Sequence, residues 1–224
     1  SEHIERFYTS FEEFMDRKFD GMIITGAPLE HLDFEDVTYW PWIQTIFDWS
    51  RTHVTSTMYI CWASQAALYH FYNIPKYDLP EKMFGIFKHH SMIENSPIFR
   101  GFDDVFYVPH SRHTEVRSED IEKVDELTIM AESWESGVYM VMARDGREIF
   151  VTGHSEYAPD TLDTEYKRDL SKGLPIKPPV NYYKDNDPNQ EIIVRWRSTA
   201  NLFFSNWLNY YVYQLTPFDI NEIH

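Results

Sequence analysis

The chain has 224 residues, of which 43% are hydrophobic and 17% aromatic, and its formal net charge is −16. This length and composition suit one folded domain over residues 1–224 and exclude a disordered chain. The acidic balance disfavours nucleic acids and membrane surfaces as partners, because phosphate backbones and anionic lipids repel negative charge.

The first third of the chain predicts the order strand, helix, strand, helix. The continuous apolar run at residues 22–25 predicts a strand buried on both faces. A helix is predicted from Pro41, a favourable first helical residue, and a second strand over residues 57–60. Residues 65–72 predict another helix, which Asn73 ends. This order predicts an α/β fold with a mostly parallel sheet flanked by helices.

The rest of the chain predicts further strands, a hairpin and two longer helices. Strands are predicted over residues 83–88, 105–108 and 127–131, and a short helix over residues 118–124. Residues 138–143 and 148–152 flank an Asp-Gly turn and predict a β-hairpin. Helices are predicted over residues 161–171 and 198–215. The proline-rich residues 175–189 between them predict an ordered surface loop.

The single cysteine, Cys61, lies where a predicted strand ends and a helix begins. Ligands of open α/β sheets bind at the carboxyl ends of strands, and a helix N-terminus stabilises a thiolate. A nucleophile on such a turn is typical of hydrolase-type folds. A buried, inert cysteine is the alternative that position alone leaves open. One cysteine excludes an internal disulfide and a thiolate zinc site, and a cytoplasmic location is the default expectation.

A possible base follows another strand, in the sequence His154-Ser155-Glu156. A cysteine nucleophile needs a base to take its proton, and that base needs an acceptor that orients its imidazole. His154 can be the base and Glu156 the orienting group. The chain has 10 histidines, so a loop histidine without a catalytic role is the alternative.

Other polar residues give weaker signals. The histidines at positions 89, 90, 110 and 113 lack neighbouring acidic ligands on one regular element, so we predict no metal site. Arg168 lies on the predicted helix that follows the His154 loop and could hold a substrate carboxylate through two hydrogen bonds. A solvated helix charge is the alternative for Arg168.

Longer motifs resemble one known family over essentially the whole chain. Residues 60–65 (Ile-Cys-Trp-Ala-Ser-Gln) and 151–157 (Val-Thr-Gly-His-Ser-Glu-Tyr) resemble the Cys…His-x-Glu layout of the class I glutamine amidotransferase-like fold. Residues 25–28, 100–104, 109–112 and 204–211 resemble the homoserine O-acyltransferases of methionine biosynthesis. The resemblance implies that fold, a homodimer, and a family N-terminal portion, including the first strand of the sheet, ahead of the segment that matches Ser1.

The resemblance also implies a catalytic role for each matching residue. Cys61 would be the nucleophile that receives the acyl group from acyl-CoA, and His154 would be the general base. Glu156 would hold the imidazole, and the backbone N–H near Trp62 would stabilise the oxyanion. The homoserine hydroxyl would then attack the Cys61 thioester, which is a ping-pong sequence.

Substrate contacts and the acyl donor are implied in the same way. Lys82, Ser111 and Arg168 match the substrate-contacting positions of the family. Acetyl-CoA users carry Glu and succinyl-CoA users Gly at the position of Glu30, and a Glu carboxylate would repel the distal carboxylate of a succinyl group. We therefore expect acetyl-CoA as co-substrate. An ordinary surface glutamate is the alternative for Glu30.

The expected function is therefore transfer of an acetyl group to L-homoserine, without a bound cofactor or metal and without a nucleic-acid or membrane partner. Use of succinyl-CoA, a cysteine-dependent glutaminase or amidase activity on the same fold, and a folded chain without activity are the alternatives. The net charge of −16 is unfavourable for the polyanion CoA, so the donor site requires a local basic patch.

Overall fold

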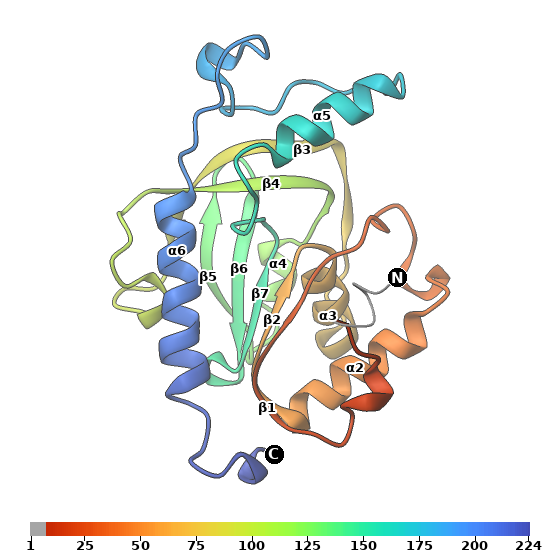
Figure 1. Cartoon of the computed structure of the whole chain (residues 1–224), viewed down its shortest axis with the longest axis vertical. Helices are drawn as coiled ribbons and strands as arrows, with labels where there is room; N and C mark the ends of the chain where they lie inside the picture. Colours follow the sequence, from red (N-terminus) through yellow and green to blue (C-terminus); the bar gives the residue numbers. More distant parts are fainter. Residues whose placement is uncertain (1–7) are drawn as a thin grey trace.

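The computed structural model describes residues 8–224, which form a seven-stranded sheet with helices on both faces (Figure 1). The strand order is β1-β2-β7-β6-β5-β3-β4. The strands are β1 (Phe19–Ile24), β2 (Val54–Ile60), β3 (Tyr77–Ser91), β4 (Phe106–Glu115), β5 (Thr128–Ser133), β6 (Gly137–Ala143) and β7 (Glu148–Val151).

The helices are α2 (Trp40–His53), α3 (Trp62–Tyr72), α4 (Ser118–Ile121), α5 (Thr161–Ser171) and α6 (Arg197–Asn206), which a π-helical segment (Trp207–Tyr213) continues. Short 3₁₀ helices span Phe11–Glu13, Phe34–Asp36, Pro97–Phe99, Arg144–Gly146, Lys184–Asn186 and Ile220–Glu222. Among the described residues, no helix has the length and apolar character that crossing a bilayer requires.

The sheet is mixed. β2 pairs in parallel with β1 and β7, whereas β7–β6, β6–β5, β5–β3 and β3–β4 are antiparallel. The α/β class, the flanking helices and the β6–β7 hairpin are therefore as predicted. The parallel part is smaller than the sequence predicted, because β3–β4, β5–β6 and β6–β7 are joined by chain reversals, and the crossover that contains α4 places β5 beside β3, to which it is antiparallel.

Strand β2 is the centre of the fold, and all seven of its residues are buried. Its side chains alternate between the two faces, as in any strand. Met58 and Ile60 pack in the cluster that contains Phe203 of α6, while Tyr59 packs in the cluster that contains Phe47 of α2. Burial of each such side chain stabilises the fold by roughly 1.5–3 kcal/mol. The carboxyl end of β2 is thereby fixed from both sides.

Four elements differ from their predictions. β1 is an edge strand, and Ile23 is 41% exposed, so this strand is not buried on both faces. β3 and β4 extend to Tyr77–Ser91 and Phe106–Glu115, well beyond the predicted ranges, because their polar residues line a cavity and interrupt the apolar pattern. The helix α4 is a single turn, four residues long.

Helix α5 covers one end of the sheet. It spans Thr161–Ser171, the predicted range, and lies beyond the sheet beside β3 and β4 (Figure 1). Residues 174–180 return from α5 toward β3, where Val180 forms a bridge with Gly85. Tyr182 and Tyr183, which follow in the predicted surface loop, are buried. This end of the molecule encloses the site described next.

Candidate active site

Cys61 occupies a sharp turn between β2 and α3. Its backbone has φ 55° and ψ −119°, a conformation that costs a non-glycine residue about 1–3 kcal/mol. The turn is held from both sides, because Cys61 N donates to Val151 O (2.7 Å) and Cys61 O accepts from Ser64 N (2.9 Å). The side chain is nearly buried but borders a cavity. The strained turn therefore presents the thiol at the carboxyl end of β2.

A glycine keeps the space beside this turn open. A Cβ atom on Gly26 would lie 3.0 Å from Trp62 N and 3.2 Å from Ile60 O. Trp62 is the first residue of α3, and the N–H groups of a first helical turn have no partner inside their helix. The N–H of Trp62 therefore has no acceptor within α3, which is what the expected oxyanion role would require of it.

His154 and Glu156 form a short contact behind the thiol. Glu156 Oε1 lies 2.6 Å from His154 Nδ1, and the imidazole stacks on Tyr157 with 4.2 Å between ring centroids. Burial opposes a charged imidazole, but hydrogen bonds to Cys61 and Glu156 outweigh it and raise the pKa of His154 to about 10. The three side chains thus lie in the order that the sequence analysis expects, with the Cys61 thiol and the Glu156 carboxylate on either side of the His154 imidazole.

A cavity of about 610 Å³ unites most of the predicted site residues. Cys61, His154, Glu30, Lys82, Ser111 and Arg168 all line it. Trp62 and Glu156 do not, since the Trp62 side chain is buried and Glu156 lines a smaller neighbouring cavity. Residues separated by more than 130 positions along the chain are brought together because β1, β2, β4, β7 and α5 meet at one end of the sheet (Figure 1).

Two carboxylates on α5 contact the side chains that we expected to bind substrate. The sequence analysis missed both carboxylates. Lys82 Nζ lies 3.5 Å from Glu165 Oε2 and 3.6 Å from Asp169 Oδ2. Ser111 Oγ donates to Glu165 Oε2 (2.5 Å), and Arg168 Nε donates to Asp169 Oδ1 (2.9 Å). The spacing of four residues places both carboxylates on one helix face, and this spacing was a signal available in the sequence.

Glu30 is not an ordinary surface glutamate. Its Oε1 lies 4.0 Å from Cys61 Sγ, and its Oε2 accepts from His113 N (3.0 Å). Burial raises the pKa of the Glu30 carboxyl, which the hydrogen bond from His113 only partly opposes. The carboxyl therefore borders the space in which an acyl group on Cys61 would lie.

A buried polar network supports the site from beneath. Arg112 is 1% exposed; its Nε donates to His110 Nδ1 (3.3 Å) and its Nη1 donates to Thr114 O (2.7 Å). His110 Nε2 lies 3.0 Å from His89 Nε2, and burial lowers the pKa of His89 to about 3 and that of His110 as well. Both histidines are neutral. In residues 8–224, no three His, Cys, Asp or Glu side chains gather as metal ligands.

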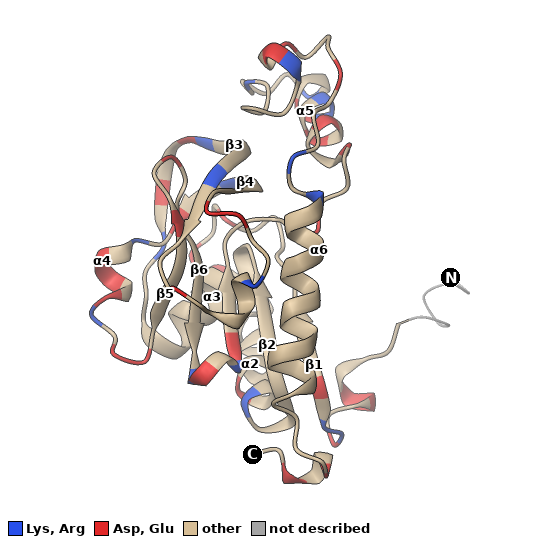
Figure 2. Cartoon of the chain, turned by 90° about the vertical axis from the view of Figure 1, so that its left-hand side faces the viewer, with Lys and Arg blue, Asp and Glu red and all other residues tan. Residues whose placement is uncertain are grey.

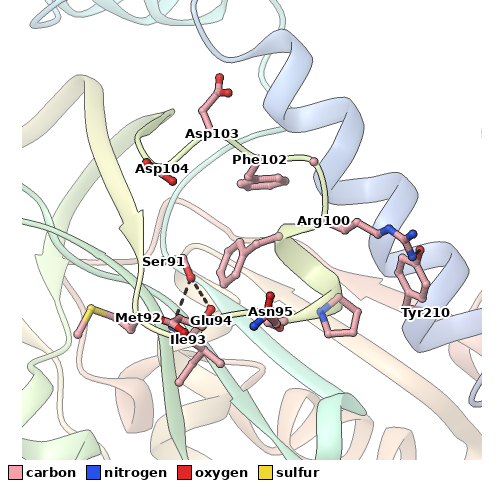
Figure 3. A pocket seen from close by; sticks show the side chains of 14 residues that line it. Ser91, Met92, Ile93, Glu94, Asn95, Arg100, Phe102, Asp103, Asp104 and Tyr210 are labelled. Carbon is pink, nitrogen blue, oxygen red and sulfur yellow. Dashed lines mark hydrogen bonds between the residues drawn. The ribbon is translucent and has the colours of Figure 1, made fainter.

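A larger cavity of about 870 Å³ shares no lining residue with the Cys61 cavity (Figure 3). It lies between residues 91–97 and the motif at residues 100–104, with Tyr210 at one side. Arg100 Nη1 donates to Tyr210 Oη (2.6 Å), and Asn206 Nδ2 donates to Arg100 O (2.9 Å). The motif at residues 100–104 therefore attaches its loop to the C-terminal helix and takes no part in the Cys61 site.

Solved structures identify the class of fold. A glutamine amidotransferase from Thermotoga maritima matches with a TM-score of 0.60 at 15% identity, over 90% of this chain and 80% of that one. A glutamine amidotransferase from Methylobacillus flagellatus matches with a TM-score of 0.60 at 12% identity, over 85% of this chain and 76% of that one. The fold is therefore that of the glutamine amidotransferases, as predicted.

Sequence relatives narrow this class to one family. The family model described as homoserine O-succinyltransferase matches residues 1–218. Proteins named homoserine O-acetyltransferase from Phocaeicola vulgatus and Brevibacillus brevis are 69% and 61% identical to this chain, over 99% of it and 73% and 72% of their own lengths. The chain belongs to the homoserine O-succinyltransferase family and is therefore an acyltransferase.

The Gly26→Ala variant tests the donor at Trp62. The added methyl group would stand 3.0 Å from Trp62 N and obstruct the oxyanion. We expect kcat to fall by roughly 10²-fold or more, the loss typical of one oxyanion donor, in a variant whose circular dichroism shows that it still folds. Glu191→Ala, which changes an exposed side chain outside the Cys61 cavity, is the control. An unchanged kcat in Gly26→Ala would remove Trp62 N–H from the mechanism.

The Glu156→Gln variant tests the orienting carboxylate through pH. Because the pKa of His154 is raised from 6.5 to about 10, its protonated form is favoured in the folded protein. This stabilisation is fully present below about pH 6.5 and is lost as the pH rises through about 10. We expect Glu156→Gln to lower the free energy of unfolding more at about pH 6 than at about pH 10.5, as measured with urea.

The same variant should reduce kcat by roughly 10²-fold, since a positioned general base contributes at least that much. Glu191→Gln, which changes an exposed glutamate outside the Cys61 cavity, is the control. An equal loss of stability at both pH values would show that Glu156 does not act through the charge of His154.

Proposed function

We propose that the chain transfers an acetyl group from acetyl-CoA to the hydroxyl of L-homoserine through a thioester on Cys61, the first committed step of methionine biosynthesis. The observation that carries this proposal is the Glu30 carboxyl 4.0 Å from the Cys61 thiol, in a cavity that also contains His154. The names of the relatives from Phocaeicola vulgatus and Brevibacillus brevis agree with this acyl group.

In the first half of the reaction, His154 takes the proton of the Cys61 thiol, and the thiolate attacks the thioester carbon of acetyl-CoA. The negative charge moves to the carbonyl oxygen, which accepts a hydrogen bond from Trp62 N–H. The carbon–sulfur bond to CoA then breaks, and the CoA sulfur takes the proton from His154. The products are acetyl-Cys61 and free CoA.

In the second half, His154 takes the proton of the homoserine hydroxyl, and the oxygen attacks the acetyl carbon. The bond to Cys61 breaks, and the Cys61 sulfur recovers the proton. Homoserine carries one carboxylate and one ammonium group, and the cavity offers both signs of charge. Arg168 would bind the carboxylate, and Glu165 with Asp169 would accept from the ammonium, with Lys82 and Ser111 beside them.

The choice of acetyl over succinyl follows from the charge of Glu30. A second carboxylate about 5 Å from Glu30 would raise the energy by about 3 kcal/mol at an effective dielectric constant of 20. Burial already raises the pKa of the Glu30 carboxyl, so the site accommodates a further anion poorly. A neutral acetyl group meets no such repulsion. The glutamate thus favours the shorter donor by excluding the charged one.

Intact-mass spectrometry without homoserine tests the thioester. We expect acetyl-CoA to add one acetyl group to the protein and homoserine to remove it, because a ping-pong enzyme holds its first product covalently. The Cys61→Ala variant should gain no mass. A succinyl adduct in place of the acetyl adduct would overturn the assignment of the donor. Release of ammonia from glutamine that depends on Cys61, without any acyl adduct, would favour an amidase.

The Glu30→Gly variant tests the donor preference. Removal of the carboxylate should raise the ratio of kcat/KM for succinyl-CoA to kcat/KM for acetyl-CoA by roughly 10²-fold, which corresponds to about 3 kcal/mol. Glu191→Gly, which removes an exposed glutamate outside both the Cys61 cavity and the neighbouring groove beside β3, is the control. If both donors change by the same factor in Glu30→Gly, Glu30 supports the site structurally and does not select the acyl group.

A further inference from the structure

The Cys61 cavity continues into a second groove of about 510 Å³, which we call the β3 groove. It lies between the beginning of β3 and residues 174–180. Five residues line both spaces, namely His31, Lys82, His113, Asp169 and Leu174. The two spaces therefore adjoin at these five residues, so the β3 groove is next to the space that a molecule bound at Cys61 would occupy.

The outer part of the β3 groove is apolar and firmly placed. Its lining residues there are Pro80, Phe84, Pro175, Ile176, Pro178 and Val180. Val180 N donates to Phe84 O (2.9 Å), and Ile86 N donates to Val180 O (2.8 Å), so this wall is attached to β3. Gly85, at φ +147°, permits the contact, because a Cβ there would lie 2.9 Å from Val180 Cα. The groove therefore exists without a ligand to form it.

A lysine lies at each end of the β3 groove. Lys82 lies at the junction with the Cys61 cavity, and Lys177 lines the β3 groove and is 77% exposed. Lys177 Nζ donates to both carboxylate oxygens of Glu81, each at 2.8 Å. Figure 2 shows Lys or Arg together with Asp or Glu on β3 and on the α5 region, the two sides of the groove. An exposed ion pair of this kind contributes less than about 1 kcal/mol. Lys177 can therefore leave the Glu81 carboxylate and bind a phosphate instead.

We propose that the β3 groove holds the pantetheine arm of the acyl donor, with the CoA phosphates beside Lys177. This inference rests on the function proposed above. The arm is an uncharged chain of methylene and amide groups, and an apolar groove with backbone edges suits that chemistry. The two substrates do not compete for space, because CoA leaves before homoserine enters in a ping-pong reaction.

A series of donors of different length tests the arm. We would measure kcat/KM with acetyl-CoA, S-acetylpantetheine and S-acetyl-N-acetylcysteamine, which keeps only the end of the arm. In Val180→Trp, whose new side chain would fill the groove, we expect a roughly tenfold loss for the two longer donors and none for the shortest. The matched control is Leu170→Trp, since Leu170 is 47% and Val180 45% exposed, and Leu170 lines neither space.

A charge variant tests the outer end. Lys177→Gln should raise KM for acetyl-CoA roughly two- to fivefold at low salt and leave KM for S-acetylpantetheine unchanged. Lys184→Gln is the control, because Lys184 is also exposed and paired with a glutamate, Glu191 at 3.4 Å, but does not line the groove. Equal responses of the two lysine variants would remove Lys177 from the donor site.

Calorimetric titration with CoA itself separates this proposal from the proposed function. With the protein free of any acetyl group, we expect the Kd of CoA to rise roughly tenfold in Val180→Trp and to stay unchanged in Leu170→Trp. If acetyl-CoA left no acetyl group on the protein, the proposed function would be wrong. The CoA titration would still decide whether the β3 groove binds CoA. Equal CoA affinity in wild type, Val180→Trp and Leu170→Trp, or no binding at all, would overturn the groove assignment.

Discussion

The strained backbone at Cys61 is the constraint on which the site depends. A cysteine held at φ 55° persists only where its surroundings define it completely, and they do so here. β2 is buried along its whole length, β7 accepts the Cys61 N–H, and α3 begins at the next residue. The fully buried strand β2 holds Cys61 in its strained conformation. The thiol and the first N–H of α3 therefore keep one position relative to each other. His154, on the turn after β7, therefore contacts a thiol whose position is already fixed.

A buried positive charge lies beneath this turn. Arg112 makes its hydrogen bonds to one neutral imidazole and to carbonyl oxygens, and removing such a cation from water costs several kcal/mol. Burial lowers the pKa of Arg112, whereas the charges of Cys61, Glu115 and Glu30 raise it. The guanidinium therefore lies near enough to Cys61, Glu115 and Glu30 for their negative charges to favour its charged form. Because His89 and His110 are neutral, neither imidazole repels the charge of Arg112.

The sequence predicted the features that local signals determine and missed those that depend on tertiary contacts. Apolar runs and helix ends predicted β2, α3 and α5, and the motif at residues 154–156 predicted the contact between the His154 imidazole and the Glu156 carboxylate. The lengths of β3 and β4 were underestimated, because Lys82 and Ser111 interrupt the apolar pattern where they face the cavity. Glu165 and Asp169 resemble solvated helix charges until β3 brings Lys82 against them.

The net charge of −16 describes the whole surface and does not determine the site. At the cavity, the cations Lys82 and Arg168 face Glu165 and Asp169, so the signs nearly balance over a few ångströms. Such alternation suits a zwitterionic amino acid, which needs a cation for its carboxylate and an anion for its ammonium group. It suits a polyanion poorly, and a donor with several phosphates is therefore better accommodated when only its neutral arm enters and its phosphates stay at the exposed rim.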